Sequence, residues 1–320
     1  MKAAIHTQYG PPEVVSVQEV DKPVPSHHEV LIRIYATTVN RTDCGFRSAE
    51  YFVSRFFSGL FKPKYQILGN EFAGRIEAIG KDVSTYKVGD RVFGYNDSRF
   101  GAHAEYMTQL ETGTMAIIPE HLSYAEAAPI LEGGHYALSD LYPANVGPGK
   151  KILVNGGTGA IGSAAVQLAR HLGAEVDAVC ATPHLELLRS LGANRVFDYT
   201  QEDFTQSDGA YDFVFDAVGK SSFGRCKRLL KPKGIYISTE LGRNGQNIWL
   251  ALITPIFGGK KVLFPLPTID KTMVELLKTL AESGEYKPVV DRTYDLSQIV
   301  EAYQYVESRQ KIGNVIITMP

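Results

Sequence analysis

The sequence predicts an α/β protein of two domains, one rich in β-strands and one built on a doubly wound parallel sheet. The chain has 320 residues, which is more than a single core usually holds. Short strands punctuated by Gly and Pro fill its first part, and from about residue 123 helices alternate with strands. We expect residues 1–122 and 267–320 to form the first domain and residues 123–266 the second.

The first domain is expected to be mostly β. Runs of β-branched and aromatic residues, separated by turn-forming residues, predict strands there. These expected strands cover residues 1–7, 14–20, 29–38, 72–79, 91–95 and 104–107. The tail reads as a helix at 271–283, an extended segment at 287–294, a helix at 296–308 and a strand at 314–319. We assign the tail to the first domain because a β-rich module with an inserted domain commonly closes with its own last strand.

The second domain is expected to alternate strands and helices. Helical patterns are found at residues 124–128, 134–144, 161–172, 183–191 and 223–230. Apolar strand-like runs lie at 151–155, 175–180, 195–198, 211–216, 234–238 and 261–264. Strands that are apolar almost throughout predict a parallel sheet covered on both faces.

Charge and cysteine content narrow the range of partners and compartments. The net charge of -2 and the pI of about 6.5 give no positive field for a nucleic acid. Cys44, Cys180 and Cys226 are an odd set, which favours a reducing, cytoplasmic compartment. The longest apolar run, residues 248–257, contains Pro255 and is too short to span a bilayer, so we expect no membrane insertion.

A glycine-rich motif follows the expected strand at 151–155 and opens the next helix. Gly157 is expected to permit a tight turn, Gly159 to let the backbone approach a pyrophosphate, and Gly162 to let the helix pack against the strand. The amino end of that helix offers free N–H groups to phosphates. We therefore expect a dinucleotide site here. Its candidate residues are Asn155, Gly157, Thr158, Gly159, Ala160, Ile161 and Gly162.

The end of the second parallel strand favours NADPH over NADH. An acid at that place would bond the ribose 2′-hydroxyl and repel a 2′-phosphate, and the sequence has Ala181 and Thr182 there. Asp177 lies inside the strand, where we expect a half-exposed residue without a role in binding. Four nearby side chains are candidates for contacts with the phosphate or the adenine. They are Thr182, His184, Arg189 and Tyr199.

The whole chain resembles the medium-chain dehydrogenase/reductase superfamily, in particular its zinc-free quinone oxidoreductase branch. The matching segments are YGPPEVV at Tyr9, LGNEFAGRIEAIG at Leu68, VGDRVFG at Val88, AEY at Ala104, the glycine motif, LRSLGA at Leu188 and DAVG at Asp216. The resemblance implies a GroES-like β domain, a Rossmann domain and a homodimer. It also implies cofactor contacts by Asp216, Ala217, Val218, Thr239, Phe264, Lys311 and Asn314. For Lys311, a solvated surface charge is the competing interpretation.

In the zinc enzymes that this superfamily contains, a Cys and a His hold the catalytic metal. The resemblance places Asn40, in VNRTD, and Asn70, in GNE, at those positions. Amides are poor zinc ligands, and three cysteines cannot form a four-Cys structural site, so we expect no zinc. Without a Lewis acid, hydride transfer to a hydrophobic quinone or α,β-unsaturated carbonyl is the favoured reaction.

Asn40 is the first candidate for orienting or hydrogen-bonding the substrate carbonyl, and Asn70 is the second. A turn or cap Asn and a satisfied buried amide are their structural alternatives. Tyr51 and Tyr65 are candidate proton donors, against simple packing. The aromatic segment 51–65 is either a lid over an apolar pocket or a core helix. Residues 247–257 likewise form a pocket wall, a dimer surface or core.

The resemblance is weaker at GGHYAL, residues 133–138, where Tyr136 stands in place of the Thr that meets the nicotinamide in the family. His135 is expected to be structural. Two other functions stay open. One is an NADPH-binding sensor or interaction protein with little turnover, and the other is an alcohol dehydrogenase, which would need bound metal.

Overall fold

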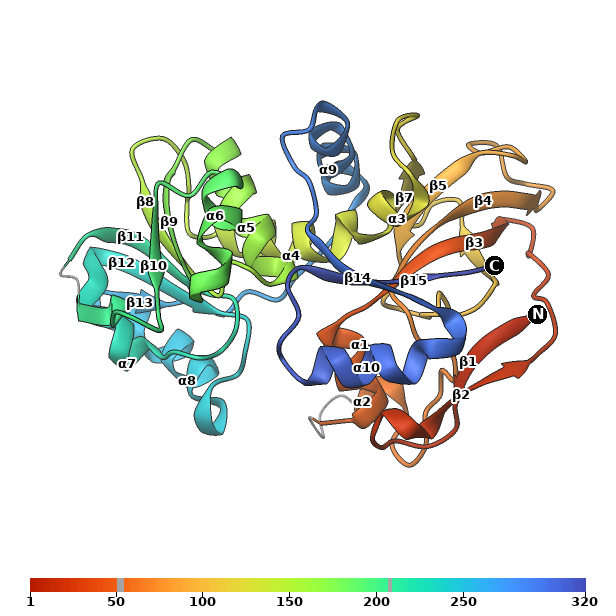
Figure 1. Cartoon of the computed structure of the whole chain (residues 1–320), viewed down its shortest axis with the longest axis horizontal. Coiled ribbons are helices and arrows are strands. Elements are labelled where there is room, and N and C mark those ends of the chain that lie inside the picture. Colours follow the sequence, from red (N-terminus) through yellow and green to blue (C-terminus); the bar gives the residue numbers. More distant parts are fainter. Residues whose placement is uncertain (51–54, 207–208) are drawn as a thin grey trace. The chain divides into compact units, whose positions relative to one another are not determined.

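The computed structural model describes residues 1–50, 55–206 and 209–320, which form two compact units (Figure 1). Unit 1 comprises Met1–Glu132, Ile269–Gly284 and Pro288–Pro320. Unit 2 comprises Gly133–Thr268 and Glu285–Lys287. Residues 123–132 thus pack with unit 1, whereas the sequence placed them in the second domain. The last two of these residues, Leu131 and Glu132, begin the next helix, and their N–H groups donate to the carboxylate of Glu71, a residue of unit 1.

Unit 1 is a β module that uses both ends of the chain. A seven-stranded sheet has the order β14-β15-β3-β4-β5-β7, with β6 also paired to β3, and β1 and β2 form a separate hairpin. The strands are β1 (Lys2–His6), β2 (Val15–Glu19), β3 (Glu29–Val39), β4 (Glu71–Ile79), β5 (Arg91–Tyr95), β6 (Tyr106–Leu110), β7 (Met115–Ile117), β14 (Val290–Asp295) and β15 (Asn314–Thr318). The tail joins this module because β15 pairs antiparallel with β3.

The helices of unit 1 include one that the sequence pattern did not predict. They are α1 (Arg41–Ser48), α2 (Arg55–Ser58), α3 (Tyr124–Ala127), α9 (Lys271–Ser283) and α10 (Ile299–Glu307). Helix α1 follows β3 directly, and Asn40 is its N-cap residue. The backbone N–H of Asn40 donates to the carboxylate of Asp43 at 2.8 Å, which stabilises the first turn. Most residues of α1 are polar, so the sequence shows no apolar stripe at helical spacing. The cap at Asn40 is the feature that indicates where the helix begins.

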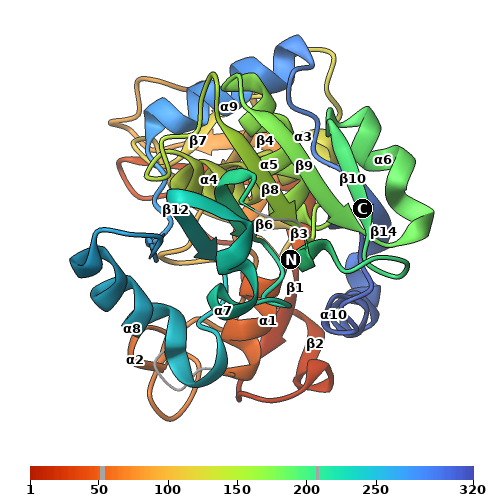
Figure 2. The ribbon, with the colours of Figure 1, turned by 90° about the vertical axis from the view of Figure 1, so that its left-hand side faces the viewer.

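Unit 2 is a parallel six-stranded sheet in the order β10-β9-β8-β11-β12-β13 (Figures 1 and 2). Its strands are β8 (Lys151–Asn155), β9 (Glu175–Cys180), β10 (Arg195–Asp198), β11 (Tyr211–Asp216), β12 (Leu230–Ser238) and β13 (Lys261–Val262). Its helices are α5 (Ala160–His171), α6 (Leu185–Ser190), α7 (Phe223–Cys226) and α8 (Gln246–Ile253), and α4 (Leu131–Leu141) enters it from unit 1. The mixed α/β fold class predicted from the sequence is confirmed.

The strand order explains how helices cover the sheet of unit 2. From β8 the chain moves outward through α5 and α6 to β9 and β10, and from β11 it moves the opposite way through α7 and α8. Because such crossovers are right-handed, the two pairs of helices lie on opposite faces. The expected helix at 223–230 differs from the structure only at its last residue: α7 ends at Cys226, a 3-10 helix continues over Lys227–Leu229, and Leu230 begins β12, where it pairs with Tyr211.

Candidate functional site: a glycine turn and a buried amide–carboxylate cluster

The turn between β8 and α5 is built from glycines, each with a different environment. Gly156 has a φ of 80°, so the tight turn lies there and not at Gly157, as the motif suggested. Gly157 instead packs closely, since an added Cβ would lie 3.0 Å from Leu188 Cδ1. Gly162 lies against the turn, and its Cβ would lie 2.1 Å from the Gly156 carbonyl oxygen. The first helical turn is therefore pressed onto the glycine turn.

The amino end of α5 is open for an anion. Gly159 is its N-cap residue, with φ of -71° and ψ of 171° and without a side-chain cap. Thr158, Ala160 and Ile161 are partly exposed. The first N–H groups of a helix have no partner inside the helix, and the helix dipole adds positive potential there. This turn has the backbone geometry that holds a pyrophosphate.

The carboxyl ends of the parallel strands bring other candidates to the same edge of unit 2. Asn155, the last residue of β8, donates from Nδ2 to Asp216 Oδ1 at 2.9 Å. Asp216 ends β11 and also accepts from the N–H of Ser221 and the hydroxyl of Tyr236. Ala217 and Val218 continue from it, and Thr239 donates its N–H to the Asp216 carbonyl at 3.2 Å. Asp216 thus organises this edge by holding neighbouring loops.

An acid from the neighbouring strand lies next to the end of β9, although no acid follows β9 directly in the sequence. Thr182 donates its hydroxyl to Asp198 Oδ2 at 2.5 Å, and Asp198 is the last residue of the neighbouring strand β10. Hydrogen bonds from Thr182 and Thr200 lower the pKa of Asp198, so its carboxylate stays ionised. No acid follows β9 in the sequence near Thr182, as we expected. In the structure, however, the carboxylate of Asp198 lies beside Thr182 at this edge of the sheet.

The remaining candidates near β9 have mixed environments. Arg189 pairs with Glu186 on the surface of α6, and the side chain of Tyr199 is 60% exposed. His184 is partly exposed, just before α6. Phe264, after β13, is partly buried in unit 2. These side chains are placed where a ligand could reach them, but none is held in a fixed polar network.

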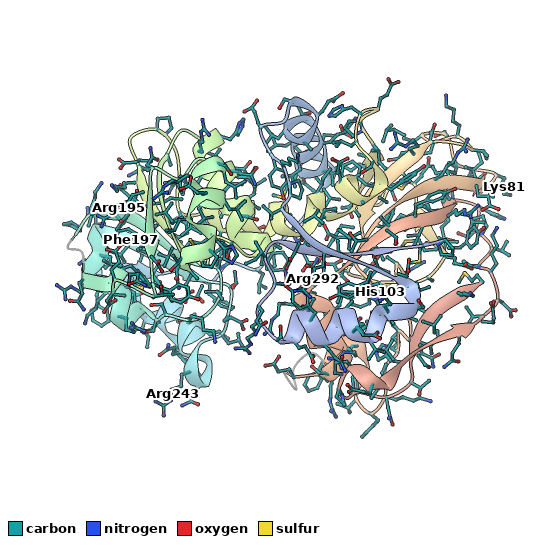
Figure 3. The ribbon with its side chains drawn as sticks, viewed as in Figure 1. Lys81, His103, Arg195, Phe197, Arg243 and Arg292 are labelled. Carbon is teal, nitrogen blue, oxygen red and sulfur yellow. The ribbon has the colours of Figure 1, made fainter. Side chains whose placement is uncertain are left out.

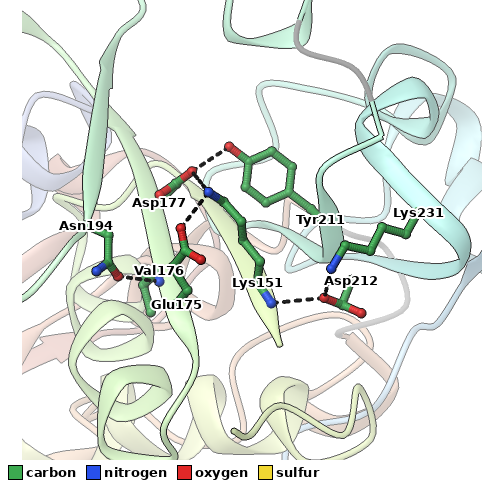
Figure 4. Close-up of polar contacts among 8 residues, drawn as sticks. All are labelled: Lys151, Glu175, Val176, Asp177, Asn194, Tyr211, Asp212 and Lys231. Carbon is green, nitrogen blue, oxygen red and sulfur yellow. Dashed lines mark hydrogen bonds and ion pairs between the residues drawn. The ribbon is translucent and has the colours of Figure 1, made fainter. Parts of the chain in front are cut away.

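Asp177 is buried, so our expectation of a half-exposed residue is wrong. It is 1% exposed, it accepts a hydrogen bond from the Tyr211 hydroxyl at 2.8 Å, and Lys151 Nζ lies 3.2 Å from it (Figure 4). These contacts tie β8, β9 and β11 together inside the sheet. Asp177 is therefore structural, as its place inside the strand indicated.

In unit 1, the side chain of Asn40 is the centre of a buried polar cluster. Its Nδ2 lies 3.0 Å from each of three acceptors, which are Thr38 Oγ1, Glu71 Oε2 and Glu132 Oε2. An amide nitrogen carries two hydrogens, so these acceptors use all of its donor capacity. Asn40 Oδ1 is buried and has no hydrogen-bond partner among the described residues. The amide therefore presents an acceptor and not a donor.

Three buried carboxyl groups surround this amide. Glu71 accepts from the N–H groups of Leu131 and Glu132 through Oε1, and from Thr38 and Asn40 through Oε2. Asp43 accepts from the N–H groups of Asn40 and Gly69.

Glu132 accepts from Thr42 Oγ1 at 2.7 Å as well as from Asn40. Burial raises the pKa of Asp43, Glu71 and Glu132, and the mutual repulsion of Glu71 and Glu132 adds to the rise for Glu71.

Asn70 and Tyr65 lie in the same unit but in different surroundings. Asn70 precedes β4, its Nδ2 lies 3.4 Å from the Tyr95 hydroxyl, and its Oδ1 is buried without a partner among the described residues. The ring of Tyr65 packs on Phe100 at 5.7 Å. Tyr51 lies outside the described residues. In the aromatic segment, Phe56 and Phe61 are 68% and 90% exposed, which differs from a core helix.

Lys311 and Asn314 are placed in unit 1 by the tail. The ammonium of Lys311 is partly buried and donates to the Gly313 carbonyl. Burial lowers its pKa, whereas the attraction of Glu132 acts in the opposite direction. Asn314 donates to the Val289 carbonyl at 3.0 Å. Lys311 is therefore a charge partner of the carboxyl cluster, which neither of our interpretations of this residue included.

Sequence reasoning missed the acids of this cluster and the hydroxyl beside them. For Glu132 the sequence has one signal, because this residue is the single acid in the otherwise apolar segment APILEGG, residues 128–134. Glu71 and Asp43 resemble ordinary polar positions of a strand and a helix. His103 (Figure 3) is buried between β3 and α10 and does not belong to this cluster. Its ring nitrogens contact the Thr38 carbonyl, at 2.8 Å from Nε2, and the Tyr303 hydroxyl, at 3.2 Å from Nδ1.

Neither a metal cluster nor a membrane span is found in the described part of the chain. Within residues 1–50, 55–206 and 209–320, no group of three or more His, Cys, Asp or Glu side chains is arranged to hold a metal ion. In the same ranges, each helix is too short or too polar to cross a membrane.

A β module closed by the chain's own tail, together with a parallel sheet that carries a glycine turn, defines a two-domain dinucleotide-binding oxidoreductase. Family models agree with this class. The alcohol dehydrogenase GroES-like domain matches residues 26–135, and the zinc-binding dehydrogenase domain matches residues 191–317.

Comparison with known proteins identifies the family. The chain is 32% identical, over 99% of its length and 79% of the relative's, to a 2-methylene-furan-3-one reductase of Solanum lycopersicum. It is 29% identical, with the same coverage, to an NADPH-dependent alkenal/one oxidoreductase of Arabidopsis thaliana. The quinone oxidoreductase structure from Coxiella burnetii has a TM-score of 0.89 at 26% identity, over 100% of this chain and 99% of that one. The chain belongs to the medium-chain dehydrogenase/reductase superfamily, in its quinone oxidoreductase-like branch.

Proposed function

We propose that this protein is an NADPH-dependent reductase that transfers a hydride to a quinone or an α,β-unsaturated carbonyl compound without a metal ion. The observation that carries the proposal is the glycine turn at the amino end of α5, which has the geometry for a pyrophosphate. The tomato relative is a 2-methylene-furan-3-one reductase and the Arabidopsis relative is an alkenal/one oxidoreductase, which supports the choice of substrate.

The glycine turn and the strand ends next to it would hold the cofactor. The N–H groups at the start of α5 would bind the pyrophosphate, and Asn155, Asp216, Ala217 and Val218 would fix the loops beside it. Phe264 and Thr239 are proposed further contacts. NADPH, when bound, supplies the hydride.

The choice of NADPH over NADH rests on Thr182 and on the NADPH dependence of the Arabidopsis relative. Asp198 argues in the other direction, because an ionised carboxylate 2.5 Å from Thr182 Oγ1 disfavours a 2′-phosphate close by. His184, Arg189 and Tyr199 are proposed to compensate from the exposed side. The comparison of the two cofactors is therefore a central part of the assay below.

The absence of a metal from the reaction is argued from ligand chemistry. Amides stand at Asn40 and Asn70, and the Asn40 nitrogen is committed to two carboxyl groups and a hydroxyl. Quinones and enones accept a hydride without strong Lewis-acid help, because their electrophilic carbon is already activated.

Asn40 and Asn70 are proposed to border the bound acceptor. In each of them the amide oxygen is buried and has no hydrogen-bond partner among the described residues, and it would accept from O–H, N–H or polarised C–H groups of a substrate. An amide oxygen repels a developing oxyanion, so the proton for the reduced oxygen has to come from another group. Tyr51 and Tyr65 are the candidates from the sequence, and Lys311 and Asn314 are proposed to stabilise the cluster and its cofactor-side neighbours.

We further propose a cytoplasmic homodimer. Apolar side chains on α8 and the turn after it are exposed, with Trp249 and Leu252 at 63%, Ile256 at 78% and Phe257 at 79%. An apolar face of this kind, next to the two-residue edge strand β13, is suited to self-association through a twofold axis. The free, buried thiols of Cys44, Cys180 and Cys226 fit a reducing compartment.

Stopped-flow oxidation of NADPH, and separately of NADH, tests the function with 1,4-benzoquinone, simple alkenals and enones as acceptors. We expect turnover with NADPH that is unchanged by a chelator. Tight NADPH binding without oxidation by any acceptor would favour the sensor, and activity lost in chelator together with bound zinc would favour an alcohol dehydrogenase. Asn40→Ala is expected to slow the reaction, and an unchanged rate would remove Asn40 from the site.

A further inference from the structure

The proton that a hydride acceptor needs has a source in the carboxyl cluster of unit 1. Most of the six carboxyl oxygens of Asp43, Glu71 and Glu132 accept hydrogen bonds from N–H groups, which can only donate. Both oxygens of Asp43 face backbone N–H groups. Oε1 of Glu71 faces two backbone N–H groups, and its Oε2 accepts from the amide of Asn40 and from the buried hydroxyl of Thr38. A proton on either Asp43 oxygen or on Glu71 Oε1 would meet another hydrogen, and a proton on Glu71 Oε2 could pass only to the buried Thr38 hydroxyl.

Among the carboxyl oxygens of this cluster that the structure describes, Glu132 Oε1 is the one whose hydroxyl partner is partly exposed. Its partner is the hydroxyl of Thr42, at 2.7 Å. A hydroxyl can turn from donor to acceptor, so Oε1 can carry a proton without losing this hydrogen bond. The other oxygen, Oε2, accepts from Asn40 Nδ2 at 3.0 Å in either protonation state. Asn40 therefore fixes the proton of Glu132 on the oxygen that faces Thr42.

The electrostatic surroundings favour a protonated Glu132. Glu132 is 4% exposed, and two further buried carboxyl groups lie beside it, Asp43 on α1 and Glu71 on β4. Lys311, which precedes β15, is an opposing charge and favours the ionised form. Burial and the charge of Asp43 outweigh this cation and the hydrogen bonds from Thr42 and Asn40, so the pKa of Glu132 is raised. A carboxylic acid that titrates near neutral pH is suited to general acid catalysis.

Thr42 connects this buried acid to the outside of unit 1. Its side chain is partly exposed, whereas Asn40, Asp43 and Glu132 are buried. When Glu132 holds the proton, the Thr42 oxygen accepts from Glu132 and its own hydrogen becomes free to donate. The pair then offers a hydroxyl donor backed by an acid, which the Asn40 amide oxygen cannot provide.

We propose that Glu132 supplies the proton for the reduced substrate through the hydroxyl of Thr42. This inference rests on the proposed reductase function. The substrate gains a hydride from NADPH at its electrophilic carbon, and its π electrons move to the carbonyl oxygen. The O–H bond of Thr42 breaks as its proton bonds to that oxygen, and the Glu132 proton moves to Thr42 Oγ. NADP⁺, an enol or hydroquinone, and a Glu132 carboxylate result, and solvent reprotonates Glu132.

Glu132→Gln tests the relay, because Gln still accepts from Asn40 but has no titratable proton. With 1,4-benzoquinone and NADPH, wild-type kcat is expected to fall as pH rises through the pKa of Glu132, since the acid form is required. In the Gln variant kcat is expected to be ~10²-fold lower at acidic pH and free of this decline. Glu301→Gln, at an exposed position of α10, is the matched control and should keep the wild-type profile.

Thr42 variants separate the relay from a structural effect. Thr42→Val should behave like Glu132→Gln, Thr42→Ser should restore most of the rate, and the double variant Thr42→Val with Glu132→Gln should be no slower than either alone. An undiminished alkaline decline in Glu132→Gln would overturn the relay, as would its disappearance in Tyr65→Phe. If none of the acceptors tested leads wild-type protein to oxidise NADPH, the proposed reductase function is refuted, and the relay is refuted with it.

Discussion

Gly162→Ala is the sharpest test of the glycine turn. The new Cβ would lie 2.1 Å from the Gly156 carbonyl oxygen, 2.9 Å from its carbonyl carbon and 3.0 Å from Gly157 Cα. All three atoms belong to the backbone, so no side chain can rotate away. Because favourable contacts between heavy atoms begin near 3.5 Å, the start of α5 must move by roughly 1 Å. Overpacking of this kind costs about 1–3 kcal/mol of unfolding free energy.

The same shift pulls the first N–H groups of α5 away from the turn, so NADPH affinity is expected to fall at least about tenfold, or ~1.4 kcal/mol. Gly159→Ala is the matched control. Its Cβ has only the Gly156 oxygen near it, at 3.7 Å, and the φ of Gly159 is -71°, which Ala adopts freely. This variant should keep or slightly gain stability, yet lose affinity because the methyl group occupies the path of the phosphates.

Urea unfolding and titration of NADPH fluorescence measure both effects. If Gly162→Ala leaves stability and affinity unchanged, the close approach between α5 and the turn is not as described. If Gly159→Ala binds NADPH as tightly as wild type, the pyrophosphate does not lie over this backbone.

Three further predictions concern other parts of the chain. Asp198→Asn should increase the ratio of kcat/KM for NADPH over NADH, and an unchanged ratio would show that this carboxylate lies away from the ribose. His103 is buried and its pKa is lowered to about 4 from 6.5, so the unfolded state binds the proton first. The contribution of His103 to stability is therefore complete above about pH 6.5 and should fall by about 3 kcal/mol towards pH 4, a loss that His103→Asn should abolish in urea titrations at several pH values. Trp249→Asp should convert a dimer into a 35.2 kDa monomer in light scattering, and a wild-type monomer would refute the proposed interface.

The sheet of unit 2 could be predicted because its signals are local. Each strand is a short apolar run, and the glycine motif joins one such run to a helix, so strand, turn and helix follow from neighbouring residues. Helix α1 and strand β7 could not be predicted in this way. α1 is short and polar, so its sequence has no apolar residues at helical spacing. Its start depends instead on the contact between the Asn40 N–H and the Asp43 carboxylate. The tip of β9 shows the same limit, because Asp198 reaches Thr182 only through the pairing of β9 with β10.

The carboxyl cluster could not be read from the sequence for a related reason. Glu71 meets Thr38 because β3 and β4 pair antiparallel, and Glu132 meets Asn40 because the start of α4 sits on the Glu71 carboxylate. Residues 43, 71 and 132 are far apart in the chain, and each alone resembles an ordinary surface acid. Only the fold makes them buried neighbours.

The composition of this cluster also argues for a role in chemistry. Burying an ionised carboxyl is costly unless donors compensate it, and replacing buried charges by apolar groups of the same volume is often neutral or stabilising. A cluster needed only for stability would have each oxygen held by a backbone or amide donor, as in Asp43, or by a fully buried hydroxyl, as at Glu71 Oε2. Glu132 differs, because one of its oxygens is held by a hydroxyl that can reverse and that reaches the partly exposed surface. This difference allows a proton to move without breaking the network, whereas a purely structural acid gains nothing from it.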